Sequence, residues 1–156
     1  PFNLDYLVRE WLESTNVQGV VLTGGKDFGI FPNRDKTEHC LLSWATEFNR
    51  PVLGICRGMQ HLIKFHGGAI LRAEGHAGTT HKIVNQSNGD SRIVNSFHDF
   101  AIYDSPDDFD IIDRAEDGSI ESLKHRSLPF CGIMWHPERE NVFASDDISL
   151  IKTALQ

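Results

Sequence analysis

Three stretches in the first half of the chain place apolar residues three or four positions apart. They cover residues 4–13, 35–48 and 57–68, and this period predicts amphipathic helices. Two short apolar runs, at residues 17–23 and 51–55, separate the three stretches and predict buried strands. Parallel strands need a crossover connection such as a helix. The alternation therefore predicts parallel strands with helices packed on the sheet.

The pattern changes after residue 69, where short β-branched and aromatic runs alternate with Gly, Asp, Ser and Pro. Such punctuation is typical of antiparallel strands. The predicted strands are residues 81–85, 91–97, 109–115, 119–126 and 130–136. A helical pattern returns at residues 145–155. The predicted fold class is therefore α/β, with a mixed, mostly parallel sheet flanked by helices and an antiparallel C-terminal meander.

Length and charge narrow the classes of function. The chain has 156 residues, 40% of them hydrophobic, which predicts a single domain over residues 1–156. The formal net charge is −7 and the basic residues are scattered, so we expect no nucleic-acid partner. No apolar run reaches the roughly 20 residues that span a bilayer, and we find no signal-peptide pattern. We expect no membrane association and a cytoplasmic location.

One of the three cysteines lies in a distinctive pattern. Cys40, Cys56 and Cys131 have no close spacing, so we expect free thiols and neither a disulfide framework nor a zinc knuckle. Residues 54–58, GICRG, fall between a predicted strand and a predicted helix and match the nucleophile elbow G-x-S-x-G with cysteine in place of serine. A helix N-terminus favours a thiolate, so we expect a lowered pKa for Cys56.

A cysteine nucleophile needs a base and an oxyanion hole. The predicted strand at residues 130–136 ends on His136, and Glu138 can turn back to orient its imidazole. The backbone N–H of Arg57 follows the elbow, and the glycines that follow the strand at residues 17–23 can offer a second donor. Each feature alone has an ordinary structural explanation. Together they favour a thiol-dependent active site.

These motifs, in this order, resemble the class I glutamine amidotransferases, whose Cys-His-Glu triad hydrolyses γ-glutamyl amides. The motifs are Gly24-Gly25, GICRGMQ at residues 54–60 and WHPE at residues 135–138. NRDKTE at residues 33–38 and VNSFHDFAI at residues 94–102 look like the branch that includes γ-glutamyl-γ-aminobutyrate hydrolase and γ-glutamyl-CDP-amidate hydrolases. The resemblance implies a flavodoxin-like fold. It also implies a strand ahead of the first helix, and we expect that strand to be missing.

The resemblance implies a role for each matching residue. Cys56 becomes the nucleophile, His136 the general base and acid, and Glu138 the group that orients His136. Gly25 and Arg57 become the oxyanion-hole donors through their backbone N–H groups. The residues implied to bind the glutamyl end of the substrate are Gln60, Asp99 and Phe100. We expect no metal and no cofactor.

Several functions stay open within this resemblance. A small γ-glutamyl substrate, either a γ-glutamyl amine or a γ-glutamyl-CDP-amidate, fits a stand-alone hydrolase. Free glutamine fits a glutaminase subunit that supplies ammonia to a separate synthetase chain. A third alternative is a binding or redox-sensing module without catalysis. The leaving amine and the oligomeric state are not predicted.

Other polar residues have simpler interpretations. We expect Arg34 and Asp35 to form a surface charge pair at the start of a helix. His76 and His81 suggest a metal site, but without a third ligand at matching spacing we expect two loop histidines. We expect His98 to have a structural role rather than to act as a second base.

Overall fold

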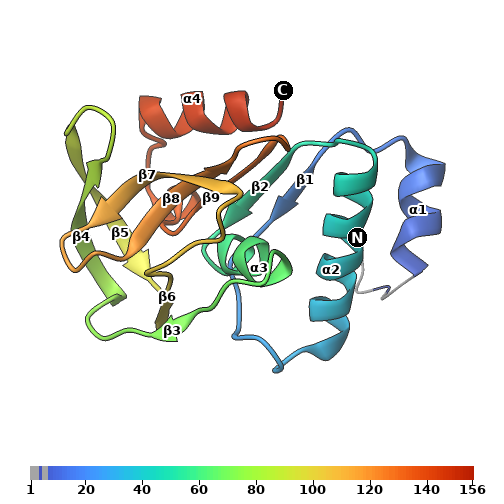
Figure 1. Cartoon of the computed structure of the whole chain (residues 1–156), viewed down its shortest axis with the longest axis horizontal. Helices are drawn as coiled ribbons and strands as arrows, with labels where there is room; N and C mark the ends of the chain where they lie inside the picture. The colour runs from blue at the N-terminus through green and yellow to red at the C-terminus, as the bar shows by residue number, and fades with distance from the viewer. Residues whose placement is uncertain (1–3, 5–6) are drawn as a thin grey trace.

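The computed structural model describes residue 4 and residues 7–156, and it is built on a curled central sheet (Figure 1). The sheet has seven strands in the order β1-β2-β9-β8-β7-β4-β5. These strands are β1 Val20–Leu22, β2 Val52–Ile55, β4 Ala77–Asn85, β5 Ser91–Phe97, β7 Phe109–Ala115, β8 Ile120–His125 and β9 Phe130–Ile133. A separate two-stranded sheet pairs β3, Leu71–Arg72, with β6, Phe100–Ala101.

The predicted mixed sheet is confirmed, with a larger antiparallel part than expected. β1, β2 and β9 are parallel, whereas the other four neighbouring strand pairs of the large sheet are antiparallel. Strand β9 joins the two parts, since it runs parallel to β2 and antiparallel to β8. The carboxyl ends of β1, β2 and β9 therefore meet at one edge of the sheet, where ligands bind in open α/β folds.

Helices cover both faces of the sheet. They are α1 Val8–Thr15, α2 Pro32–Glu47, α3 Arg57–Phe65 and α4 Ser145–Ala154. Side chains alternate along β2, so that Val52 joins the apolar core with α1, α2 and α3 while Leu53 joins the core with α4. Figure 1 shows α4 and α3 on opposite sides of the sheet.

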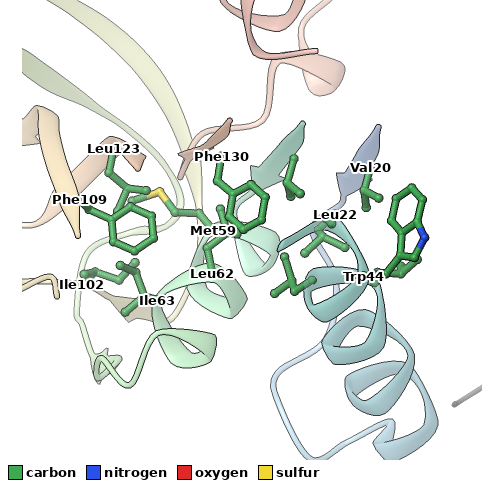
Figure 2. Packing of buried hydrophobic residues seen from close by; sticks show 14 of the residues in the cluster. Val20, Leu22, Trp44, Met59, Leu62, Ile63, Ile102, Phe109, Leu123 and Phe130 are labelled. Carbon is green, nitrogen blue, oxygen red and sulfur yellow. The ribbon is translucent and has the colours of Figure 1, made fainter. Parts of the chain in front are cut away.

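The core beneath α3 fixes this helix against the sheet. Met59, Leu62 and Ile63 are fully buried, and Figure 2 shows Met59 beside Phe130 of β9. A Cβ on Gly132 would lie 2.6 Å from Met59 Cγ, so the helix packs onto a strand position without a side chain. Each such buried side chain contributes about 1.5–3 kcal/mol. The N-terminus of α3 is therefore held firmly at the carboxyl edge of the strands.

The predicted first helix is confirmed from Val8 and continues to Thr15. The prediction starts at residue 4, which lies outside the helix in the structure. Residues 5 and 6 lie outside the described residues, and so do residues 1–3, on which the expectation of a missing first strand depends. In the described part of the chain, β1 is an edge strand of the large sheet. No helix in this part combines the length and the apolar character that crossing a membrane requires.

Candidate active site

Cys56 occupies the sharp turn between β2 and α3. Its φ of 51° and ψ of −107° lie outside the usual regions for a residue with a side chain. The Cys56 N–H donates to the Ile133 carbonyl at 2.7 Å, and the Cys56 carbonyl accepts from Gln60 N at 3.0 Å. These two bonds tie the turn to the end of β9 and to the first turn of α3. The predicted strand-to-helix elbow is confirmed.

The two glycines of the elbow are required by close backbone contacts. A Cβ on Gly54 would lie 2.7 Å from the carbonyl carbon of Gly58. A Cβ on Gly58 would lie 2.1 Å from the Leu22 carbonyl oxygen, which belongs to β1. Both distances are well below normal contact, so any side chain at either position forces the backbone apart. Gly58 allows α3 to begin directly against β1.

His136 follows β9 and is 2% exposed. Its Nδ1 lies 2.6 Å from Glu138 Oε1. A carboxylate only accepts hydrogen bonds, so Nδ1 carries the proton and Nε2 of the neutral ring is the proton acceptor. Nε2 is buried and has no hydrogen-bond partner among the described residues. The structure therefore brings His136 and Glu138 together in the way that a base and its orienting group require.

Asn95 of β5 holds the backbone of His136. Its Nδ2 donates to the His136 carbonyl at 2.8 Å, and its Oδ1 accepts from the His136 N–H at 2.8 Å. The same amide nitrogen donates to Glu140 Oε1 at 2.6 Å. No pattern in the sequence assigns this role to Asn95, because its partners lie about forty residues away. The only sequence feature that points to Asn95 is its place in VNSFHDFAI, the segment at residues 94–102 that resembles the γ-glutamyl hydrolase branch.

The expectation of a lowered pKa for Cys56 is wrong for this structure. Burial raises the pKa of the Cys56 thiol to about 11, although a hydrogen bond from the Arg57 backbone and the charge of Arg139 act in the opposite direction. The charge of Glu138 raises it further. Only 5% of the Cys56 surface is exposed, so desolvation of the thiolate outweighs the helix terminus. The thiol is therefore protonated at neutral pH and needs a base.

Gly24 and Gly25 lie between His136 and Arg34. A Cβ on Gly24 would lie 2.5 Å from His136 Cε1, and a Cβ on Gly25 would lie 2.0 Å from Arg34 Nη1. Arg34 Nη2 donates to the carbonyls of Thr23 at 2.8 Å and Gly24 at 3.0 Å. With these carbonyls held by Arg34, the orientation of the peptide groups in the loop is fixed. The loop follows β1, beside the elbow.

The expectation that Arg34 and Asp35 form a surface pair is wrong, because both contribute to a partly buried ionic cluster. Arg34 Nε donates to Glu38 Oε1 at 2.7 Å, while the Arg57 guanidinium donates to both Asp35 and Glu38. His61 Nδ1 lies 3.0 Å from Glu38 Oε2. Burial raises the pKa of Glu38, but hydrogen bonds from His61, Arg57 and Arg34 outweigh burial and hold this pKa at about 2. Glu38 thus links the loop after β1 to the start of α3.

The residues expected to bind the glutamyl end are only partly assembled. Gln60 Nε2 donates to the Phe100 carbonyl at 2.9 Å, and Gln60 is 4% exposed. The Asp99 carbonyl instead accepts from Ala73 N at 2.9 Å between β3 and β6. The structure therefore brings the Gln60 side chain to the backbone of Phe100, whereas the carbonyl of Asp99, just before β6, is bound to Ala73.

The interpretation of His76 and His81 as two loop histidines holds for His76, whereas His81 lies on β4. Their ring centroids lie 4.9 Å apart, and the His98 ring lies 4.8 Å from that of His76. His98 Nε2 lies 3.8 Å from Glu121 Oε1 in the same cluster. Burial and the neighbouring His76 lower the pKa of His98 to about 4, so His98 is neutral at pH 7. His76 and His81 therefore do have further potential metal ligands beside them, His98 and Glu121, which are distant in the sequence.

Residues 2–146 match the family model described as glutamine amidotransferase class-I. The chain is 37% identical over 147 residues to γ-glutamyl-CDP-amidate hydrolase of Campylobacter jejuni, covering 90% of this chain and 72% of that protein. It is 30% identical over 149 residues to a subunit of the glutamine-hydrolysing GMP synthase of Pyrococcus abyssi, covering 89% of this chain and 76% of that protein.

Among solved structures, a Thermoplasma acidophilum protein proposed to be a GMP synthase subunit matches with a TM-score of 0.76 and 20% identity. The match covers 98% of this chain and 76% of that one. At this level of identity, the likeness establishes a shared fold. The chemistry has to be inferred from the residues of the site.

Proposed function

Because the chain belongs to the class I glutamine amidotransferase family, we propose that it cleaves the γ-glutamyl amide bond of a small γ-glutamyl conjugate. The products are glutamate and an amine, and a thioester on Cys56 is the intermediate. The observation that carries this proposal is the buried Nε2 of His136, which has no hydrogen-bond partner in the described part of the chain, while Nδ1 is bound to Glu138. That atom is the natural acceptor for the thiol proton.

In the first step, Cys56 Sγ attacks the γ-carbonyl carbon while its proton passes to His136 Nε2. The raised pKa of Cys56 makes this transfer necessary, since few thiolates exist at neutral pH before substrate binds. Glu138 accepts the Nδ1–H bond and stabilises the imidazolium that forms. The protonated His136 then gives the proton to the departing nitrogen as the C–N bond breaks.

The tetrahedral oxyanion needs donors in fixed positions. We assign this role to the backbone N–H groups of Gly25 and Arg57. Arg34 supports the assignment because its contacts with the Thr23 and Gly24 carbonyls fix the loop. Glu38 binds both Arg34 and the side chain of Arg57. The loop that contains Gly25 and the turn that contains Arg57 are therefore tied to one carboxylate.

Glutamate leaves after water attacks the thioester with His136 again as base, which restores the Cys56 thiol. Gln60, together with the backbone around Asp99 and Phe100, is assigned to the glutamyl end of the substrate. The bond from Gln60 to the Phe100 carbonyl supports this placement, because it ties β6 to α3.

The likeness to γ-glutamyl-CDP-amidate hydrolase, at 37% identity, supports a γ-glutamyl-CDP-amidate or a γ-glutamyl amine as substrate. The 30% identity to a GMP synthase subunit supports a second candidate, a glutaminase subunit working with a separate synthetase. Redox sensing is disfavoured because the Cys56 thiol is buried and its pKa is raised.

The test is steady-state glutamate release from three substrates: γ-glutamyl-CDP-amidate, γ-glutamyl-γ-aminobutyrate and glutamine. We expect turnover of one conjugated substrate far above turnover of glutamine. Cys56→Ala should abolish it, because no other group can form the thioester. Cys40→Ala is the matched control, since this partly buried thiol lies on α2 and has no assigned role.

The alternatives give different results. Glutamine turnover that appears only with an added synthetase identifies a glutaminase subunit, which overturns the hydrolase. Equal turnover by wild type and Cys56→Ala contradicts the thioester mechanism. No glutamate from any of the three substrates, with or without a synthetase, favours the binding module.

A further inference from the structure

Three histidines and a glutamate converge beside the candidate active site. His76 precedes β4, His81 lies on β4, His98 follows β5 and Glu121 lies on β8. Each offers one ligand atom, and these atoms all lie within 4.8 Å of one another. His76 and His98 are each 5% exposed and Glu121 is fully buried, so water has little access to them. None of these residues takes part in the proposed hydrolysis.

Each of the four side chains has one buried polar atom without a hydrogen-bond partner in the described structure. These atoms are His76 Nδ1, His81 Nε2, His98 Nε2 and Glu121 Oε2. An unsatisfied buried polar group typically costs about 1–3 kcal/mol. His81 Nε2 and Glu121 Oε2 lie 3.1 Å apart and can pair with each other, which leaves the buried nitrogens of His76 and His98 to be satisfied. A single partner that accepts electron pairs from all four atoms removes the cost.

The hydrogen bonds of the other ring nitrogens fix two tautomers. His98 Nδ1 lies 2.9 Å from the Phe100 carbonyl, and His76 Nε2 lies 3.0 Å from Asp117 Oδ2. Carbonyl and carboxylate oxygens only accept, so both of these nitrogens carry protons. In the neutral rings, His98 Nε2 and His76 Nδ1 then present lone pairs to the interior of the cluster.

The lone pair of His98 Nε2 meets the Glu121 carboxylate rather than a donor, and His81 lies against the same carboxylate. His98 Nε2 lies 3.8 Å from Glu121 Oε1, and His81 Nε2 lies 3.1 Å from Glu121 Oε2. A proton on His81 Nε2 lets His81 donate to Glu121, but it leaves the lone pairs of His76 and His98 without a partner among the described residues. A cation at the centre satisfies all four groups.

We propose that His76, His81, His98 and Glu121 bind one divalent transition-metal ion, and that Zn²⁺ is the ion that suits them best. Three imidazole nitrogens with one carboxylate match zinc ligation, whereas Mg²⁺ and Ca²⁺ prefer oxygen ligands. Metal-bound histidines usually donate their second N–H to a carboxylate or a carbonyl. Asp117 and Phe100 supply these acceptors.

The outer partners are themselves held in place. Asp117 accepts hydrogen bonds from Ser119 N at 3.0 Å, Ser119 Oγ at 2.7 Å and Tyr103 Oη at 3.1 Å. The Phe100 carbonyl, which accepts from His98, also accepts from Gln60. The ion would therefore fix the orientation of His98 and, through Phe100, the position of Gln60. Its function is to position this wall of the substrate site.

A second histidine cluster in the described residues does not meet these criteria. His66, Asp108 and His125 also lie close together. His125 Nδ1, however, accepts hydrogen bonds from Ser127 N at 3.1 Å and Leu128 N at 3.0 Å. In the neutral ring its Nε2 then carries the proton and cannot ligate a metal. This cluster provides a matched control.

The test is zinc binding by the full chain after removal of any affinity tag and dialysis against a chelator. Binding is measured by competition with a chromophoric chelator, and metal content by elemental analysis. We expect about one zinc per chain for wild type and for His66→Gln. His81→Ala should lose binding, and Asp117→Asn should weaken it about 10- to 100-fold. His81 is the least buried ligand, so its replacement disturbs folding least.

Failure of wild type to bind zinc, or equal affinity in wild type and His81→Ala, overturns the proposal. If His81→Ala does not fold, the visible spectrum of wild type loaded with Co²⁺ decides, because tetrahedral nitrogen and oxygen ligation gives intense absorption and a free ion does not. The measurement needs no substrate. Its result is therefore independent of the proposed hydrolysis.

Discussion

The side-chain amide of Asn95 pairs with both backbone polar groups of His136, donating to the carbonyl and accepting from the N–H at 2.8 Å each. His136 lies beyond the last residue of β9, where strand pairing no longer fixes the chain. The amide thus replaces the missing strand partner. The imidazole is positioned through its backbone by Asn95 and through its ring by Glu138.

Replacing Asn95 by alanine should therefore damage both stability and activity. Asn95→Ala leaves a buried N–H and carbonyl unpaired, and we expect a loss of about 1–3 kcal/mol in the free energy of unfolding. Glutamate release should also fall, since His136 is no longer held. Urea unfolding and the glutamate assay measure the two effects.

Asn88→Ala, in an exposed turn, should change stability by less than about 0.5 kcal/mol. Unchanged activity of folded Asn95→Ala would contradict the positioning role.

The ionic cluster around Glu38 should make stability depend on acid pH. The folded-state pKa of about 2 lies below the ordinary value of 4.5, so ionised Glu38 stabilises the fold above pH 4.5. This contribution is lost as the pH falls from 4.5 toward 2. Urea unfolding midpoints measured across this range should decline for wild type. Glu38→Gln should have a smaller decline, because the titrating group is gone.

Glu38→Gln should also be less stable at neutral pH. It removes one of the two carboxylates that pair with buried Arg57, and breaking a buried ion pair typically costs about 3–5 kcal/mol. Glu13→Gln removes an exposed carboxylate that pairs with Arg9 at 3.1 Å and should cost less than about 1 kcal/mol. Equal effects of the two substitutions would show that the cluster is worth no more than a surface pair.

Alkylation of Cys56 should follow its raised pKa. With the pKa at about 11, the rate of reaction with iodoacetamide should keep rising from about pH 7 to about pH 10, because only the thiolate reacts. Mass spectrometry of the peptide that contains Cys56 separates it from the other two cysteines. A rate that levels off below about pH 8 would show that the thiolate is already stable in the free protein.

The local parts of the site could be predicted from the sequence. The elbow at Cys56 depends on two glycines and a strand-to-helix junction within five residues, and the structure confirms it. His136 and Glu138 are two residues apart, so their contact needs only one short turn. The helices and most strands of the sheet also follow from local periodicity.

The remaining parts depend on contacts between distant segments. Arg34 reaches the carbonyls after β1 only because α2 packs there, and no spacing rule indicates that contact. The proposed zinc ligands come from β4 and the residue before it, from the residue after β5 and from β8, so His76 and His81 have no visible third partner in the sequence. The raised pKa of Cys56 depends on how deeply the elbow is covered, which the fold decides.

The position of β9 has a consequence for synthesis of the protein. This strand lies between β2 and β8 but is made after every other strand of the sheet. Until residues 130–133 leave the ribosome, β2 has no partner on one side and Cys56 N–H has no acceptor at Ile133. Contacts of such long sequence separation form slowly. The nascent chain therefore carries Cys56 without a complete elbow until β9 has been made and has inserted beside β2.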